Sequence, residues 1–292
     1  IPDHTCKMFK DLMSGVYGGK NYEEDDIQVI TQYQDPKKSW SAPVLNPPLQ
    51  KFLRQNDRLL FQNNDRDFYQ NDRVIHVKRN SYEMKRYEME GNVFKEVMTF
   101  GAVNGEVGKL VGIVRSDRVS IFPFNANTYK PKNDEDAKLL ERYLERVDDL
   151  RDDSAFYGEE FYFVVVKYYD TDLHKDVYVL YRAHSKTVVN GYDNIMYLEG
   201  RDLGNLELAY ALTAHKMQGS QSKAVIAVFG RSGSPMFVNR NMINVIITRS
   251  QEFVGLIGSV EGSDSAIERG RVNVSPRKRN DILGVLAGEV EI

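Results

Sequence analysis

The chain has 292 residues, of which 39 are Lys or Arg and 42 are Asp or Glu, and its net charge at pH 7 is −3. A hydrophobic fraction of 41% and a charged fraction of 28% predict a soluble globular protein of roughly two domains. No apolar run reaches the ~18–20 residues of a membrane span, so we expect no membrane partner. The single cysteine, Cys6, excludes an internal disulfide framework and indicates a reducing compartment, which we take to be the cytoplasm.

The charge is unevenly distributed. Residues 133–160 hold eleven acidic and four basic side chains, which leaves a net charge of +4 on the rest of the chain. A mildly basic body is compatible with a groove that binds phosphates. The five histidines show no metal-ligand spacing, and the prediction for metal sites is therefore none.

The first hundred residues predict an α/β arrangement. The chain begins at Ile1 without a methionine, which favours a piece excised from a longer protein. Residues 5–14 are expected to form a helix, residues 27–31 (IQVIT) a buried strand, and residues 46–55 a helix with Asn46 as its N-cap and proline in its first turn. A strand with a basic end follows at residues 72–80. Asn80, at that end, is either an ordinary turn residue or a nucleic-acid contact.

The middle of the chain predicts strands. A turn signal at residues 104–108 (NGEVG) precedes apolar runs at residues 110–114 and 119–122, which is typical of a hairpin, and further strands are expected at residues 161–169 and 177–182. Between them, residues 134–151 have the spacing of an acidic amphipathic helix. This helix is predicted either to cover the neighbouring strands or to offer a docking face for a partner.

The last third holds the residues with the clearest chemistry. Residues 206–212 alternate as a short strand does, and residues 213–219 (TAHKMQG) then supply hydrogen-bonding side chains before a second, continuous apolar strand at residues 224–229. Ligands of open α/β sheets bind at the carboxyl ends of strands, so this loop is a candidate binding site. A helix at residues 239–250 places Arg249 near its end, and residues 253–258 form the next strand.

Two of these segments resemble motifs of a known family. Residues 213–220 (TAHKMQGS) resemble motif V of superfamily 1 helicases in the RecD/TraA-like branch, and residues 244–250 (NVIITRS) resemble motif VI. The segments at residues 45–50, 72–80 and 104–108 are also similar to the branch. The resemblance implies an α/β fold: a RecA-like parallel-sheet domain of the P-loop NTPase type, made of residues 1–102 and 204–292. It is interrupted at residues 103–203 by a small β-barrel with a helical insertion.

The resemblance also implies site residues. Arg249 would be the catalytic arginine that neutralises charge on the γ-phosphate, although a helix-end arginine can instead bind the last carbonyls of its helix. The expected nucleotide contacts are Gln218, Gly219, Gln221 and Arg249, with Gln221 standing where the family usually has Glu. The expected nucleic-acid contacts are Thr213, His215, Lys216 and Asn80.

Neither a phosphate loop nor a strand ending in Asp-Glu occurs in the sequence. ATP and Mg²⁺ are therefore expected to bind mainly to a missing N-terminal RecA-like domain, and this chain alone to be inactive. The implied function is 5′→3′ translocation on single-stranded DNA. An RNA helicase of the same superfamily and a non-catalytic nucleic-acid-binding module remain alternatives.

Overall fold

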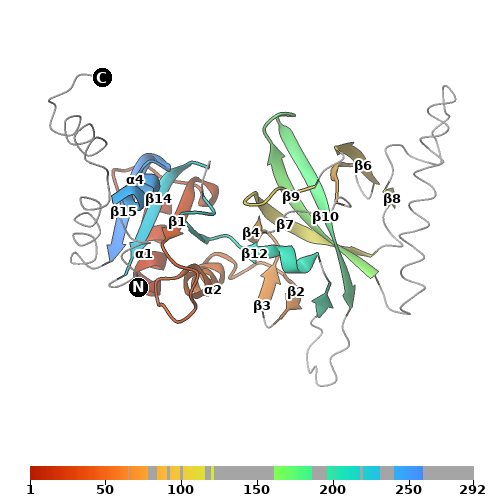
Figure 1. Ribbon diagram of the computed structural model, residues 1–292, viewed down its shortest axis with the longest axis horizontal. Helices are drawn as coiled ribbons and strands as arrows, with labels where there is room; N and C mark the ends of the chain where they lie inside the picture. The colour runs from red at the N-terminus through yellow and green to blue at the C-terminus, as the bar shows by residue number, and fades with distance from the viewer. Residues whose placement is uncertain are drawn as a thin grey trace, which may run out of the picture. The chain divides into compact units, whose positions relative to one another are not determined.

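The computed structural model describes residues 1–64, 66–77, 84–90, 93–98, 101–115, 120–121, 161–185, 196–200, 202–217, 220–230 and 240–258 (Figure 1). The chain divides into two compact units. Unit 1 comprises Ile1–Leu53 and Tyr210–Ile292, and unit 2 comprises Arg54–Ala209. The second unit is thus inserted into the first along the sequence.

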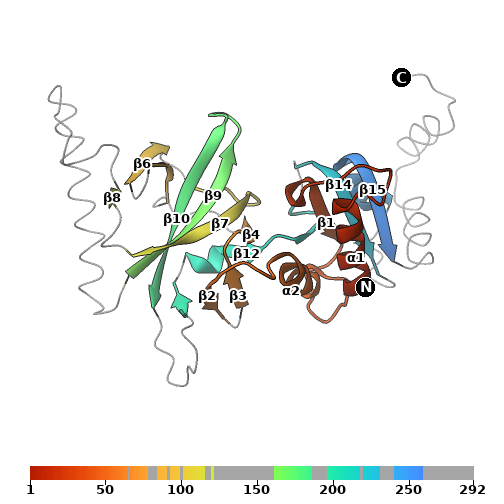
Figure 2. The same ribbon diagram turned by 180° about the vertical axis from the view of Figure 1, so that it is seen from behind.

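The described part of unit 1 contains one sheet of four parallel strands in the order β13-β1-β14-β15. Two helices that contact each other, α1 and α2, are seen together in Figure 2. A short 3-10 helix, η1, leads into β1. The bounds are α1 Pro2–Met13, η1 Glu24–Asp26, β1 Ile27–Thr31, α2 Ala42–Leu53, β13 Ala211–Thr213, β14 Ser222–Phe229, α4 Arg240–Ile247 and β15 Ser250–Gly258.

Burial explains why these segments form the core of unit 1. All five residues of β1 are buried, as are the last six of β14, which is the pattern of strands covered on both faces. Phe9 and Leu12 of α1 are fully buried. On β15, Gly255 lies against Met8 of α1 so closely that an added Cβ would overlap its sulfur. The parallel α/β character expected from the sequence is observed in this unit.

The described part of unit 2 contains a nine-stranded sheet in the order β12-β4-β7-β9-β10-β5-β6-β8, with β11 pairing to β10, and a separate hairpin of β2 and β3. The pairs are antiparallel except for β6 with β8. The strand bounds are β2 Leu59–Asn63, β3 Arg66–Tyr69, β4 Arg73–His76, β5 Arg86–Glu90, β6 Val93–Met98, β7 Val107–Arg115, β8 Ser120–Ile121, β9 Phe161–Asp170, β10 Lys175–Ser185, β11 Leu198–Glu199 and β12 Leu206–Leu208. A 3-10 helix, η3, spans Leu203–Asn205.

The boundaries of the inserted unit differ from the expected 103–203. The expected RecA-like segment, residues 1–102, includes β4 and β5, but β4 pairs with β7 and β5 pairs with β10. These ladders place both strands in unit 2, so the division falls at Leu53/Arg54 and Ala209/Tyr210. The recorded pairings, among the described residues, run from β12 to β8 without joining these two end strands into a barrel. The predicted acidic helix at residues 134–151 lies outside the described residues.

Two local predictions were wrong. The expected strand at residues 206–212 is two strands, because β12 pairs with β4 in unit 2 while β13 pairs with β1 in unit 1. The expected N-cap, Asn46, lies inside α2, which begins four residues earlier. Its side chain pairs with the backbone of Ala211.

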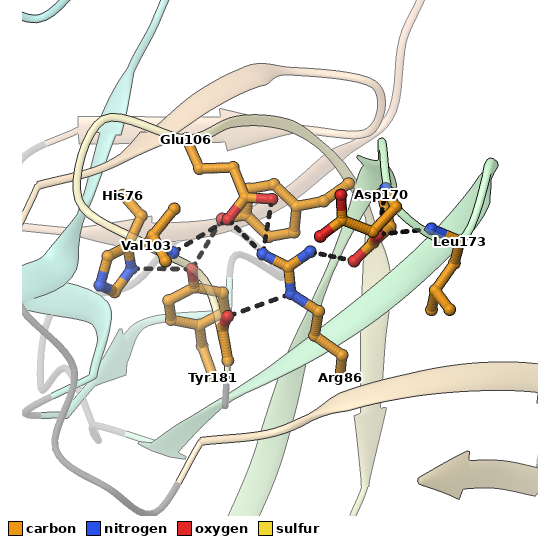
Figure 3. Close-up of polar contacts among 10 residues, drawn as sticks. His76, Arg86, Val103, Glu106, Asp170, Leu173 and Tyr181 are labelled. Atoms are coloured by element: carbon orange, nitrogen blue, oxygen red, sulfur yellow. Dashed lines mark hydrogen bonds and ion pairs between the residues drawn. The ribbon is translucent and has the colours of Figure 1, made fainter. Parts of the chain in front are cut away.

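A buried ionic cluster joins three segments of unit 2 (Figure 3). Arg86 of β5 donates to both carboxylate oxygens of Glu106 at 2.9 and 2.8 Å, to the Asp170 carboxylate, and to the carbonyl of Gly101 at 3.1 Å. Burial pushes the pKa of Asp170 up, but hydrogen bonds from the Leu173 N–H and from Arg86 outweigh it and hold that pKa below its ordinary value. For Glu106, burial dominates and the pKa is raised.

A line of buried ring side chains lies beside this cluster. The Tyr181 hydroxyl is 2.9 Å from Nδ1 of His76 and 2.7 Å from the hydroxyl of Tyr168. Burial raises the pKa of both tyrosines, so both remain neutral. The cluster and the rings together fix β4, β5, β9 and β10 relative to one another inside unit 2.

Candidate functional site

The predicted binding loop begins at the carboxyl end of β13. Thr213 aligns with Thr31 at the end of β1, and the N–H of Ala214 donates to the Thr31 carbonyl at 3.1 Å. The N–H groups of Lys216 and Met217 then both donate to the Thr213 carbonyl, at 2.9 and 3.2 Å. This single turn ends β13.

The residues of this turn differ in how deeply they are buried. Ala214 and Met217 are buried, and Thr213 is 8% exposed, whereas His215 is exposed and Lys216 is half-buried. The two apolar side chains therefore hold the turn on the sheet. His215 and part of Lys216 are exposed to solvent at this end of the sheet.

The position of β13 depends on Asn46, which the sequence predicts to be a helix N-cap. Asn46 donates from Nδ2 to the Ala211 carbonyl at 3.0 Å and accepts from the Ala211 N–H at 2.8 Å. Gln28 donates to the Tyr210 carbonyl at 3.1 Å. Because β13 is an end strand of the sheet, Asn46 satisfies backbone groups of Ala211 on the side that has no neighbouring strand, whereas the Tyr210 carbonyl also accepts from the Val29 N–H of β1 at 3.3 Å. No local pattern around Asn46 could have indicated this pairing, which spans 165 residues.

Arg249 follows α4 and directly precedes β15. Its Nε donates to the Val245 carbonyl at 3.2 Å, which is the helix-end contact considered from the sequence, and its Nη1 donates to the Ser220 carbonyl at 3.3 Å. Its own carbonyl accepts from the Ser222 N–H at 2.9 Å. These bonds join the residue before β15 to the residues that lead into β14.

Gln221 belongs to the same group. The Nε2 of Gln251 donates to the Gln221 Oε1 at 3.4 Å, so the amino ends of β14 and β15 carry Gln221, Arg249 and Gln251 side by side. Gln218, Gly219 and Asn80 lie outside the described residues.

Ion pairs flank this amino-terminal edge. Lys223 lies 2.9 Å from Asp26, and Lys20 pairs with Glu252. The hydrogen bond and charge of Asp26 raise the pKa of Lys223, and the hydrogen bond from Lys20 lowers the pKa of Glu252. These pairs lie at the surface, where ion pairs add little to stability. The amino-terminal edge therefore presents charged side chains to solvent. Within the described ranges, no group of three His, Cys, Asp or Glu side chains is arranged to hold a metal ion.

The candidate residues thus occupy opposite edges of one sheet. Thr213, His215 and Lys216 lie at the carboxyl ends of β1 and β13, whereas Gln221 and Arg249 lie at the amino ends of β14 and β15. At ~3.3 Å per residue, the five residues of β1 separate the two edges by roughly 16 Å. The segment between Thr213 and Ser222 runs from one edge to the other.

Comparison with known proteins gives a partial match. No protein-family model matches the chain. The ATP-dependent RecD2 DNA helicase of Deinococcus radiodurans is 33% identical to it over 93 residues, which are 32% of this chain and 13% of that protein. The chain is similar to superfamily 1 helicases of the RecD-like kind.

Solved structures of superfamily 1 helicases were also found. The Pif1 helicase from Candida albicans has 15% sequence identity and a TM-score of 0.39, and the match covers 99% of this chain and 55% of that one. The Bacteroides Pif1 helicase, solved with ADP-AlF3 and single-stranded DNA, has 13% identity and a TM-score of 0.40, with 99% and 51% covered. Both TM-scores are below 0.5, and the similarity of this chain to helicases is carried by the RecD2 match and the two motifs.

This chain therefore spans about half the length of the Pif1 chains that it matches, and the RecD2 match is a small part of that helicase. Among the described helices, none is long and apolar enough to cross a membrane.

Proposed function

We propose that this chain is the C-terminal motor half of an ATP-dependent helicase that moves 5′→3′ along single-stranded DNA in the cytoplasm. Unit 1 would be its second RecA-like domain and unit 2 an elaborated form of the inserted barrel domain. A first RecA-like domain in the same polypeptide would supply the phosphate loop and the carboxylate for Mg²⁺. The similarity to RecD2 and the order of the two motifs support this proposal.

The position of Arg249 is the observation that carries it. Arginine has five N–H donors in a planar fork that matches phosphate oxygens, and the two described bonds engage only Nε and Nη1. The bonds to Val245 and Ser220 hold the guanidinium at the α4–β15 junction. A γ-phosphate brought to this edge would meet a positioned cation, and neutralising its developing charge is worth roughly 10³–10⁵ in rate in related systems.

In this proposal the two edges of the sheet bind different ligands. Thr213, His215 and Lys216, with Asn80, would contact the DNA backbone, while Arg249 and Gln221, with Gln218 and Gly219, would contact ATP. The segment between Thr213 and Ser222 would couple the two, because it is anchored by Thr31 at one edge and by Arg249 at the other. A shift of the DNA contacts would then move the nucleotide contacts.

The test uses the complete polypeptide and Arg249→Ala. Nucleotide binding should be largely retained, since the phosphate loop would supply most of it, and DNA-stimulated ATP hydrolysis should fall by on the order of 10²-fold or more. Arg249→Lys should rescue little, because a point charge does not reproduce the forked contact. Arg66→Ala, which removes an exposed arginine of unit 2, is the control and should hydrolyse ATP normally.

Hydrolysis at the parental rate by Arg249→Ala would remove the catalytic role from this residue. Matched DNA and RNA oligonucleotides in the same assay distinguish a DNA helicase from an RNA helicase. A complete polypeptide that binds nucleic acid without hydrolysing ATP would instead identify a non-catalytic binding module.

A further inference from the structure

A loop that follows the carboxyl end of β1 contains side chains whose polar atoms are buried and have no hydrogen-bond partner among the described residues. They are Gln32, through both atoms of its carboxamide, Trp40, through its indole Nε1, and Ser41, through its hydroxyl. Gln32 is 6% exposed and Ser41 is fully buried. Buried polar groups in native proteins are nearly always paired, because an unpaired one has lost its water without compensation. Three such side chains within ten residues therefore point to a partner that binds here.

The loop lies at the edge that carries His215. Gln32 directly follows Thr31, which is in register with Thr213, and the Thr31 hydroxyl donates to the Trp40 carbonyl. The Trp40 ring packs on Gly230 at the end of β14, where any Cβ would overlap the ring. All of these contacts are within unit 1. The unpartnered groups thus gather where β1, β13 and β14 end.

The polar atoms of Gln32, Trp40 and Ser41 indicate the kind of ligand that would bind them. Gln32 Nε2, Trp40 Nε1 and the Ser41 hydroxyl are donors, and the Lys38 ammonium lies 5.8 Å from the centre of the Trp40 ring. Several donors beside one cation complement a phosphodiester, which offers only acceptor oxygens and a negative charge. The remaining acceptor, Gln32 Oε1, suits a donor on the sugar or base of the same nucleotide.

The loop must move before this ligand can reach these atoms, because they have almost no exposed surface. Its two ends are joined by a hydrogen bond of 3.0 Å from the Ala42 N–H to the Tyr33 carbonyl, so residues 34–41 form a closed loop on the sheet. Residues 34–37 are exposed, and turn bonds within the loop link Lys38 to Asp35 and Ser41 to Lys38. The loop can therefore shift as a unit around its closed ends.

We propose that Gln32, Trp40 and Ser41 form a second contact to the backbone of a single-stranded nucleic acid, reached when residues 34–41 move off the strand ends. The inference rests on the proposed function only in that a nucleic-acid strand crosses this edge of unit 1. It adds residues outside motif V to that contact. It also makes the loop respond to the bound nucleic acid, because the side chains find partners only in the shifted state.

Trp40 is the only tryptophan in the sequence, so its emission reports on the loop without labelling. The chain is titrated with dT15 and with U15 at low salt, and binding is followed in parallel by the anisotropy of an end-labelled oligonucleotide. Trp40 emission should change and saturate at the same Kd as the anisotropy. A response to both oligonucleotides indicates recognition of the shared phosphodiester, and a response to one alone indicates a contact to its sugar or base.

Gln32→Leu separates a binding role from a structural one. It should weaken oligonucleotide binding about tenfold, or ~1.4 kcal/mol. The Tm should stay constant or rise, since the substitution removes an unpaired buried amide. Gln55→Leu makes the same chemical change at an exposed position of unit 2 and should alter neither quantity.

Binding without any change in Trp40 emission, or with full affinity in Gln32→Leu, would overturn the inference and leave the proposed function standing. A lower Tm with unchanged affinity would assign Gln32 a structural role and also overturn it. If the chain shows no anisotropy change with either oligonucleotide, both this contact and the strand-binding part of the proposed function fail.

Discussion

Replacing Arg86 with methionine is the most direct test of how unit 2 is held together. The side chain is buried and binds Glu106 with two hydrogen bonds, Asp170 with one and the Gly101 carbonyl with one. Methionine is similar in length and apolar, so Arg86→Met removes the charge and the donors while keeping much of the packing. Both carboxylates then remain in the interior without their cation.

The expected loss follows from that geometry. Removing one partner of a buried ion pair costs about 3–5 kcal/mol, because the other charge is left uncompensated. Asp170 keeps the N–H groups of Asp172 and Leu173, and Glu106 keeps that of Val103, which moderates the cost. We therefore expect unit 2 to lose about 3 kcal/mol, at the lower end of that range.

Two measurements locate the effect. Amide hydrogen exchange should accelerate in β5, β9 and β10, because local opening of their ladders becomes easier. Urea unfolding followed by circular dichroism gives the free energy. Arg66→Met, an exposed change in the same unit, is the control and should cost no more than about 0.5 kcal/mol. A loss for Arg86→Met as small as this control would refute the idea that the cluster fixes the sheet.

Further outcomes are expected from the architecture, the buried carboxylates and the binding edge. Replacing Arg54–Ala209 with a Gly/Ser linker should leave folded unit 1 with native Trp40 emission. Replacing only residues 103–203 should remove β7 from β4 and β10 from β5, leave only the pairs β4–β12 and β5–β6, and cause aggregation on gel filtration. The folded-state pKa of Glu106 is raised, so the free energy of unfolding of unit 2, measured in urea, should increase as the pH falls from neutrality towards 4.5. The folded-state pKa of Asp170 is lowered, so this increase should reverse as the pH falls below 3.8. Glu106→Gln should abolish the gain, and an unchanged pH profile would contradict the assignment. His215→Ala should weaken single-stranded DNA binding, and Lys216→Ala should also reduce the salt slope by about 0.7, while Lys10→Ala on α1 should leave the slope unchanged.

Short-range sequence patterns were sufficient to predict much of the secondary structure of unit 1. The strand at residues 27–31 was predicted with its observed bounds, and the continuous apolar run at residues 224–229 lies within β14. The helix predicted at residues 239–250 contains α4, but α4 ends at Ile247, so Arg249 follows the helix instead of lying within it. These segments form from short-range signals: an unbroken apolar run is typical of a strand buried on both faces, and helical spacing gives a helix one packed face. The motif resemblance predicts that Arg249 and Gln221 share one site, and this stays a prediction; both residues lie at the amino ends of β14 and β15.

Pairing between distant segments was decided only by the tertiary structure. Nothing local in residues 206–213 shows that β12 joins unit 2 and β13 joins unit 1, because both halves have the same alternation and differ only in their partners, β4 and β1. Asparagine is a preferred residue type at a helix N-cap, yet the side-chain amide of Asn46 pairs with Ala211, 165 residues away. The ion cluster of Arg86 likewise joins residues separated by 20 and 84 positions. The sequence determined which segments could be strands or helices, whereas the division into units depended on which ladders and buried charges could be satisfied together, and that is a property of the folded chain alone.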